Sequence, residues 1–197
     1  MTATEQSTRS AILEAAKHVL LGSGYAGLST RKIAEIAGVP LSQIHYHFGS
    51  KQGLVLSLLA DENERLLKRQ PSMYAEDLPL WKQWEQACDF LEDDLASGYV
   101  RVLQEMTAAG WSDPEIAAAV RQMIESWFKV LSEVAARAAE RVGGLGPFTP
   151  DEAGVIAGAP FLGIESLILL GFEEKVLPMR SALRKFGELL RSLEEGR

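Results

Sequence analysis

Five side chains that can form hydrogen bonds lie close together between residues 42 and 47 of this 197-residue chain. They are Ser42, Gln43, His45, Tyr46 and His47. They alternate with Leu41, Ile44 and Phe48, whose spacing of three and four residues is typical of one apolar face of a helix. Such a helix can turn its polar and aromatic groups away from the core and toward the major groove of DNA.

The residues just before this helix predict a second short helix and a tight turn. The hydroxyl of Ser29 can cap that helix, because the first backbone N–H groups of a helix lack partners. Its apolar residues share one face: Ile33, Ile36 and Ala37. Gly38 follows, where a positive φ is easy only for glycine, and Pro40 can start the next helix. This arrangement is typical of a helix-turn-helix that binds double-stranded DNA.

The net charge of -7 is unevenly distributed along the chain. Residues 1–51 contain five Lys and Arg and three acidic residues, together with all three histidines. Residues 52–197 contain fifteen basic and twenty-four acidic residues. The sequence therefore predicts a cationic DNA-binding domain in residues 1–51, followed by an acidic domain in residues 52–197.

Composition indicates a globular protein of the cytoplasm. Hydrophobic residues make up 47% and charged residues 24% of the chain, as in ordinary soluble proteins. The single cysteine, Cys88, cannot form an intramolecular disulfide or a multi-cysteine metal site, and we expect it in the core. The first fifteen residues contain no apolar run of signal-peptide length.

Apolar periodicity predicts an all-α chain of about nine helices. Besides the two short helices above, the expected helices span residues 8–21, 50–69, 78–96, 99–109, 113–142, 149–172 and 179–194. We expect residues 1–7 to be frayed and Gln70-Pro71-Ser72 to end the fourth helix. The first three helices are expected to share one core: Ile12, Val19, Leu28, Ile33, Ile36, Val39, Ile44 and Phe48.

The most apolar segment is the run of twenty residues from Ala153 to Phe172, which carries one charge, Glu165. It is long enough to span a bilayer, but Pro160 and Glu165 in its middle disfavour a span, so we expect no membrane. A helix that is apolar all round must be buried on every side. We expect one side to face its own domain and the other to face a second copy. Small residues would permit that approach: Gly158, Ala159 and Gly163. The last two helices would thus form a homodimer.

Aromatic, methionine and acidic side chains on separate helices of the C-terminal part predict a small-molecule site. The candidate ligand-binding residues are Trp81, Trp84, Asp89, Met106, Trp111, Met123, Trp127, Phe161 and Glu165. Taken singly, each of these large apolar residues is more typical of a helical core than of a ligand site. Glu165 needs a partner, because a carboxylate on an apolar helix is costly to bury. That partner could lie in the ligand cavity or across the dimer seam.

An enzyme would need a nucleophile and a base within reach of each other. The histidines all lie in the first part of the chain, and Cys88 has no histidine near it in the sequence. His45 and His47 are two residues apart, which places them on different faces of a helix. We therefore expect no catalytic residues, no metal site and no cofactor.

The stretch LSTRKIAEIAGV, followed by I-H-Y-H-F-x-S-K and a long helix, resembles the TetR family of bacterial transcriptional regulators over residues 8–60. Beyond residue 70, the likeness rests on helix number, helix length and the apolar penultimate helix. The resemblance implies a homodimeric repressor that a small, largely apolar or aromatic effector releases from a palindromic operator. An activator and a ligand-independent DNA-binding protein of the same fold are the alternatives.

The resemblance also implies residues that contact DNA: Ser29, Thr30, Arg31, Lys32, Ser42, Gln43, His45, Tyr46, His47 and Lys51. Arg31 is expected to read guanine, and Gln43 could read adenine. Lys51 is expected to bind phosphate at the start of its helix. Three positions depart from the family pattern: Leu41 replaces a frequent lysine, Gln43 stands where the family usually has threonine, and His45 replaces the usual first tyrosine.

Overall fold

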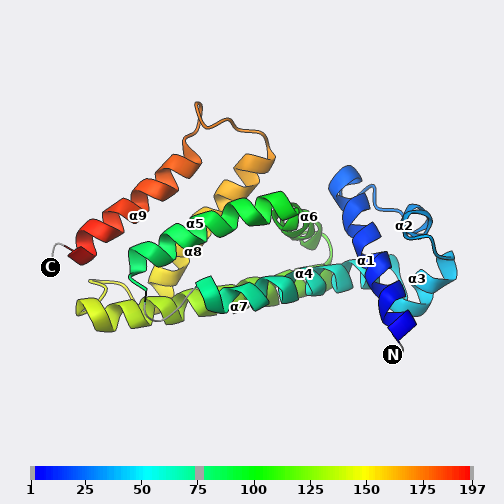
Figure 1. Ribbon diagram of the computed structural model, residues 1–197, viewed down its shortest axis with the longest axis horizontal. Helices are drawn as coiled ribbons and strands as arrows, with labels where there is room; N and C mark the ends of the chain where they lie inside the picture. Colours follow the sequence, from blue (N-terminus) through cyan, green and yellow to red (C-terminus); the bar gives the residue numbers. More distant parts are fainter. Residues whose placement is uncertain (1–2, 74–77, 196–197) are drawn as a thin grey trace. The chain divides into compact units, whose positions relative to one another are not determined.

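The computed structural model describes residues 3–73 and 78–195, and within them every regular element is an α-helix (Figure 1). The helices are α1 (Ala3–Ser23), α2 (Thr30–Ala37), α3 (Leu41–Phe48), α4 (Lys51–Met73), α5 (Leu80–Ser97), α6 (Tyr99–Gly110), α7 (Pro114–Val142), α8 (Pro150–Leu169) and α9 (Met179–Glu195). The all-α fold with nine helices, predicted from periodicity, is confirmed.

Three expected helix boundaries are wrong. The helix α1 begins at Ala3 instead of near residue 8, so most of the segment expected to be frayed is helical; Met1 and Thr2 lie outside the described residues. The helix α4 continues through Pro71 to Met73, since a proline weakens a helix without always ending it. The helix α8 ends at Leu169, shortly before Gly171, whose φ of 82° is left-handed.

Backbone contacts divide the chain into two compact units. The first comprises Met1–Leu66 and Arg101–Arg121, and the second comprises Leu67–Val100 and Gln122–Arg197. The chain therefore passes between units inside α4, near the start of α6 and inside α7. The boundary predicted after residue 51 concerns the DNA-binding domain and stays a prediction. Besides α1, α2 and α3, the compact first unit contains most of α4, most of α6 and the start of α7.

The helices α1, α2 and α3 share a buried core in the first unit. The predicted core residues that are buried are Ile12, Val19, Leu28, Ile33, Ile44 and Phe48. Val39 is half-buried. The prediction for Ile36 is wrong, because this side chain is 44% exposed. The helix α2 buries Ile33 and Ala34, and Ile36 lies at the edge of the face that those two residues define.

Most of the helix ends predicted from capping residues are confirmed. The Oγ of Ser29 accepts a hydrogen bond from the backbone N of Lys32 at 3.5 Å, and Gly38 ends α2 with a φ of 66°. Thr149 and Glu152 form a reciprocal capping box at the start of α8. Hydrogen bonds from Thr149 lower the pKa of Glu152.

In the second unit, α5 and α9 lie side by side (Figure 1). The indole Nε1 of Trp84 on α5 donates a hydrogen bond of 2.7 Å to the carbonyl of Leu183 on α9. The glycine Gly187 permits this approach, since a Cβ there would lie 3.0 Å from the Trp84 ring. About one turn before Trp84, at the start of α5, the carboxylate of Glu194 on α9 accepts hydrogen bonds from the backbone N of Leu80 and of Trp81. The N-cap residue of α5, Pro79, forms no side-chain cap. The carboxylate of Glu194 on α9 therefore satisfies backbone N–H groups in the first turn of α5.

The helix α8 buries one stripe of residues spaced by four, three and four: Gly154, Gly158, Phe161 and Glu165. Gly158 was expected to face a second copy, and this is wrong. A Cβ on Gly158 would lie 2.6 Å from a Leu131 methyl and 2.7 Å from the Phe128 ring, so this glycine serves the packing of α8 on α7. Ala159 and Gly163, by contrast, are exposed.

A buried ion pair joins α1 to α4 within the first unit. The Nζ of Lys17 donates to both carboxylate oxygens of Glu62, at 3.0 and 2.8 Å. Arg65 lies 3.7 Å from the same carboxylate. The two partners are 45 residues apart, so no local pattern in the sequence could have indicated the pair.

Replacing Lys17 with Met should lower the free energy of unfolding by about 3 kcal/mol, because Glu62 would stay buried without its main partner. The double replacement Lys17→Met and Glu62→Leu should recover most of that loss, since it removes both buried charges. Urea unfolding at one fixed protein concentration, followed by circular dichroism, measures both values. A double variant that is less stable than Lys17→Met would contradict this account.

Candidate nucleic-acid interface and effector site

The first turn of α2 presents two cationic side chains to solvent. Arg31 and Lys32 are exposed, whereas Thr30 is half-buried. Ser29 is exposed, but its hydroxyl is occupied as the cap of α2. Arg31 and Lys32 are therefore the groups at this position that are free to reach a phosphate or a base edge.

The helix α3 has an inward and an outward face, as its apolar spacing predicts. Ile44 and Phe48 are buried, whereas Ser42 and His45 are exposed and Tyr46 is 70% exposed. A third set of side chains is half-buried: Leu41, Gln43 and His47. An eight-residue helix with an exposed polar and aromatic face has the dimensions of an element that enters the major groove.

The two histidines of α3 have different surroundings. The Nδ1 of His45 lies 3.2 Å from the carbonyl oxygen of Gly49, so this nitrogen carries the hydrogen of that contact. The Nε2 of His47 is buried, with no hydrogen-bond partner among the described residues, and its ring lies between Tyr46 and Phe48. His45 is thus oriented toward solvent by a local contact, and His47 is held by its aromatic neighbours.

The first turns of α1 contact α3, and these contacts were not predicted from the sequence. The hydroxyl of Tyr46 donates to the carboxylate of Glu5 at 3.3 Å. The guanidinium of Arg9 lies 5.6 Å from the centre of the Phe48 ring. These contacts are a physical reason for α1 to begin at Ala3, because tertiary contacts stabilise terminal helical turns that would otherwise fray.

Lys51 lies at the start of α4, as expected, and its ammonium is held by the turn between α1 and α2. Its Nζ donates to the carbonyl oxygen of Tyr25 at 3.3 Å and lies 4.9 Å from the centre of the Tyr25 ring. The backbone N of Tyr25 donates to the carboxylate of Glu105 on α6 at 3.0 Å. Burial and the charge of Asp113 raise the pKa of the Tyr25 phenol.

A second contact joins the start of α4 to the start of α7. The side-chain amide of Gln52 donates to both carboxylate oxygens of Asp113 at 3.0 Å. Neither this contact nor the contact between Tyr25 and Glu105 was predicted from the sequence. The partners are separated by 61 and 80 residues, so no periodic signal links them.

The nine predicted ligand-binding residues divide between the two units. Met106 and Trp111 belong to the first unit, and the other seven belong to the second. Met106 is fully buried, whereas Trp111 is 83% exposed.

Three of the other seven residues meet in the core of the second unit. The ring centres of Trp84 and Phe161 lie 5.3 Å apart, and Trp127 packs against the same cluster. Its buried members include Cys88, Leu91 and Leu183. Cys88 is buried in the core, as expected from the sequence, and this burial raises the pKa of its thiol to about 11. Contact of these aromatic residues with an effector stays a prediction.

The remaining four predicted ligand-binding residues are Trp81, Asp89, Met123 and Glu165. The guanidinium of Arg191 lies 4.7 Å from the centre of the Trp81 ring, and Asp89 pairs with Arg184. The sulfur of Met123 lies 3.7 Å from the hydroxyl of Tyr99. Glu165 is buried on the inner stripe of α8, so it faces its own unit.

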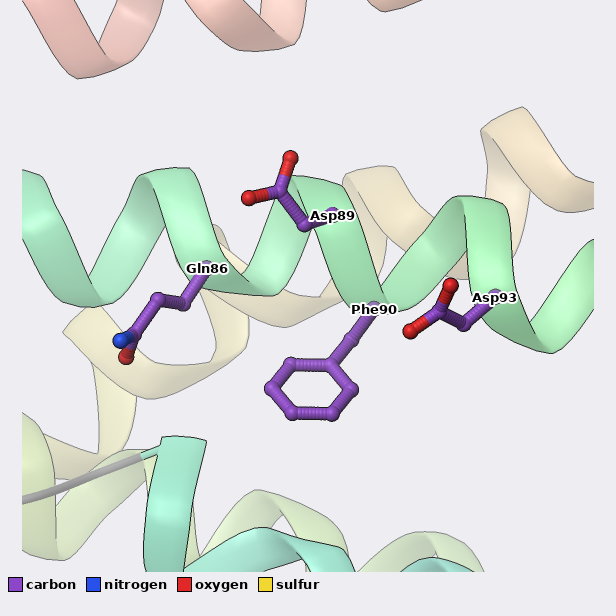
Figure 2. Close-up of a pocket in the computed structure, with 4 residues that line it drawn as sticks. All are labelled: Gln86, Asp89, Phe90 and Asp93. Atoms are coloured by element: carbon purple, nitrogen blue, oxygen red, sulfur yellow. The ribbon is translucent and has the colours of Figure 1, made fainter.

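A pocket of about 230 Å³ lies along α5 and is lined by Gln86, Asp89, Phe90 and Asp93. Figure 2 shows Gln86 and Phe90 extending from one side of α5, whereas Asp89 extends from the opposite side. The Oε1 of Gln86 is buried and has no hydrogen-bond partner among the described residues. Of the four lining residues, only Asp89 is among the ligand-binding residues predicted from the sequence. The helical spacing of Gln86, Phe90 and Asp93 was the signal that could have indicated the others.

Comparisons with known proteins agree with this arrangement. The sequence model of the family described as "Bacterial regulatory proteins, tetR family" matches residues 12–58. The HTH-type transcriptional regulator UidR of Escherichia coli is 23% identical over 157 residues, which cover 77% of this chain and 74% of that protein. The regulator TtgR of Pseudomonas putida is 41% identical over 59 residues, 30% of this chain and 28% of that protein.

Solved structures share the fold over nearly the whole chain. A transcriptional regulator from Saccharomonospora viridis in complex with choline has a TM-score of 0.77 at 22% identity, covering 93% of this chain and 96% of that one. FadR from Bacillus subtilis in complex with stearoyl-CoA has a TM-score of 0.71 at 16% identity, covering 92% and 96%. The match of residues 12–58 identifies this part of the chain as the DNA-binding domain of a TetR-family transcriptional regulator, and the solved structures show that the fold of nearly the whole chain is shared.

Proposed function

We propose that this protein is a homodimeric cytoplasmic repressor that binds a near-palindromic operator and leaves it when a small effector binds. The observation that carries the proposal is the outward face of α3, with Ser42, His45 and Tyr46 exposed above a buried Ile44. Arg31 on α2 supplies a guanidinium that can donate two hydrogen bonds to guanine. In a dimer, two copies of α3 would enter successive major grooves about 34–36 Å apart.

An exposed apolar face on the last two helices supports dimerisation. On α8, Val155 and Ile156 are more than half exposed, and on α9 so are Leu189 and Leu193. Contiguous apolar surface of this kind marks a contact with another molecule. By length and composition α8 could cross a membrane, yet its other face is a packed stripe against α7. A second copy of the chain, which is typical of the family, covers the exposed face without leaving Glu165 in lipid.

The pocket along α5 supports an effector with an apolar part and a hydrogen-bond donor. The ring of Phe90 offers an apolar surface, and the buried Oε1 of Gln86 can accept one hydrogen bond. Asp93 adds an exposed carboxylate at the rim. The structural relatives crystallised with choline and with stearoyl-CoA hold molecules that combine polar and apolar groups.

Two helices supply a route from the effector to DNA. The helices α4 and α7 each begin in the first unit and end in the second. An effector that favours one geometry of the second unit would shift α4 and change the distance between the two α3 helices. Coupling of about 1–3 kcal/mol is typical of such systems, and the effector must bind the DNA-free geometry more tightly.

Selection from a random duplex library should yield a near-palindromic operator, and Arg31→Ala should weaken its binding about tenfold or more. Arg121→Ala is the matched control, because it removes the same charge from an exposed position on α7, outside the helix-turn-helix. Fluorescence anisotropy at fixed salt measures both variants. Equal losses in the two variants would contradict a base contact by Arg31.

Transcription from the selected site should rise when the protein is removed; a fall would favour the activator alternative.

The replacement Ile156→Glu should convert the dimer to a monomer and abolish tight operator binding, because a charge would be buried in the apolar seam. Light scattering after size-exclusion chromatography reports the oligomeric state. Leu21→Glu is the control, since it places the same charge on an exposed leucine of α1. A dimer that persists in Ile156→Glu would place the interface elsewhere.

Compounds that combine an aromatic ring with an amine should release the operator more readily than sugars or nucleotides of similar size. Phe90→Ala should raise the concentration needed for release about tenfold, as expected for loss of one buried aromatic contact. Operator release in an anisotropy assay measures this, with the exposed Phe148→Ala as control. Release by the same compounds at unchanged concentrations would exclude the α5 pocket as their site.

A further inference from the structure

The ammonium of Lys51 is fixed by the turn between α1 and α2 through two contacts. One N–H donates to the carbonyl of Tyr25, and the charge lies over the face of the Tyr25 ring. An ammonium has three N–H donors, so two of them stay available for a phosphate. The position of Lys51 therefore depends on the position of the Tyr25 backbone.

The Tyr25 backbone is in turn held by Glu105, from a helix outside the helix-turn-helix. The Oε2 of Glu105 accepts the Tyr25 backbone N–H at 3.0 Å, and its Oε1 pairs with Arg101 at 2.7 Å. Gly24, with a φ of 67°, makes room for this carboxylate, because a Cβ there would lie 3.2 Å from its nearer oxygen. All these residues belong to the first unit.

We propose that Glu105 is a positioning residue for DNA binding, which acts through the Tyr25 turn to hold Lys51 ready for a backbone phosphate. The inference rests on the proposed DNA contact of Lys51 and adds a residue that lies far outside the helix-turn-helix. A lysine side chain loses considerable rotamer freedom when it is fixed on a ligand. Because Tyr25 already restricts the Lys51 side chain in the free protein, less conformational entropy is lost when DNA binds.

Deleting the carboxylate of Glu105 should change the affinity for DNA in the direction opposite to that expected from net charge alone. Deleting an acidic residue makes a protein less negative and should by itself strengthen its binding to DNA. Glu105→Ala should instead weaken binding, because the Tyr25 turn loses its acceptor and Lys51 loses its anchor. Glu105→Gln keeps an oxygen that can accept from Tyr25, so this variant should retain most of the affinity.

The test is a double-variant cycle on the full-length protein with the operator obtained by selection. Anisotropy titrations at several salt concentrations compare the unsubstituted chain with Lys51→Ala, Glu105→Ala, Glu105→Gln and the pair Lys51→Ala with Glu105→Ala. Circular dichroism and light scattering confirm that each variant is folded and dimeric. Glu115→Ala is the matched control, since it removes an exposed carboxylate from α7 in the same unit.

Lys51→Ala and Glu105→Ala should each weaken binding roughly tenfold and reduce the salt slope by about one for each subunit. The double variant should be no more than about twofold weaker than Lys51→Ala, because both changes remove the same contact. Glu115→Ala should bind as tightly as the unsubstituted chain or more tightly.

Full affinity in Glu105→Ala, or losses that multiply in the double variant, would overturn the role of Glu105 while leaving the proposed function intact. The same holds if Lys51→Ala binds as the unsubstituted chain does. If Glu105→Ala fails to fold, a Glu105→Gln variant that binds as weakly as Lys51→Ala would overturn the proposal, and one with near-full affinity would support it. Absence of DNA binding by the unsubstituted chain would overturn the proposed function, and this inference with it.

Discussion

The shortness of α2 and α3 is the constraint on which the first unit depends. Each has eight residues, too few for a helix to be stable alone in water. They exist because Ile33 and Ile44 are fully buried and Phe48 nearly so, in a core shared with α1. The polar face of α3 is exposed as a consequence, since the apolar face is committed to that core. The face of α3 proposed to contact DNA and the face that stabilises the fold are therefore opposite sides of the same short helix.

Charged contacts between distant segments orient the elements around that core. Lys17 and Glu62 tie α1 to α4, Glu105 holds the turn before α2, and Glu194 caps α5 from α9. Buried or half-buried pairs of this kind add little net stability, because desolvation offsets most of the attraction. Their geometric requirements are strict, however, so they favour one arrangement of helices over near alternatives. In the first unit, such contacts link the DNA-binding helices to α6 and α7.

In the second unit the two faces of α8 have different requirements. The inner stripe of Gly154, Gly158 and Phe161 packs within the unit, and Gly158 lets α7 approach closely. The outer face, with Val155 and Ile156, is left exposed by the single chain. Trp84 and Phe161 fill the space between α5 and α8 as packed rings. An effector that used this core would have to displace packed aromatic side chains, whereas the α5 pocket beside Phe90 is already open.

The helical fold, most helix ends and the two faces of α3 could be predicted from the sequence. These features follow from local rules: apolar spacing, capping side chains at Ser29 and Thr149, and a glycine with positive φ at Gly38. The same rules misplaced Ile36, because periodicity gives the direction of a face but not where its edge falls in an eight-residue helix.

The partners of the carboxylates, and the packing of Gly158 inside its own chain, could be learned only from the folded structure. The folded structure was also needed to show that Trp111 is exposed, whereas the rings of Trp84 and Phe161 pack against each other. The physical reason is separation in sequence. The contact of Glu105 with Tyr25 joins residues 80 apart, and no periodic pattern carries information about a pairing that only the folded chain brings together.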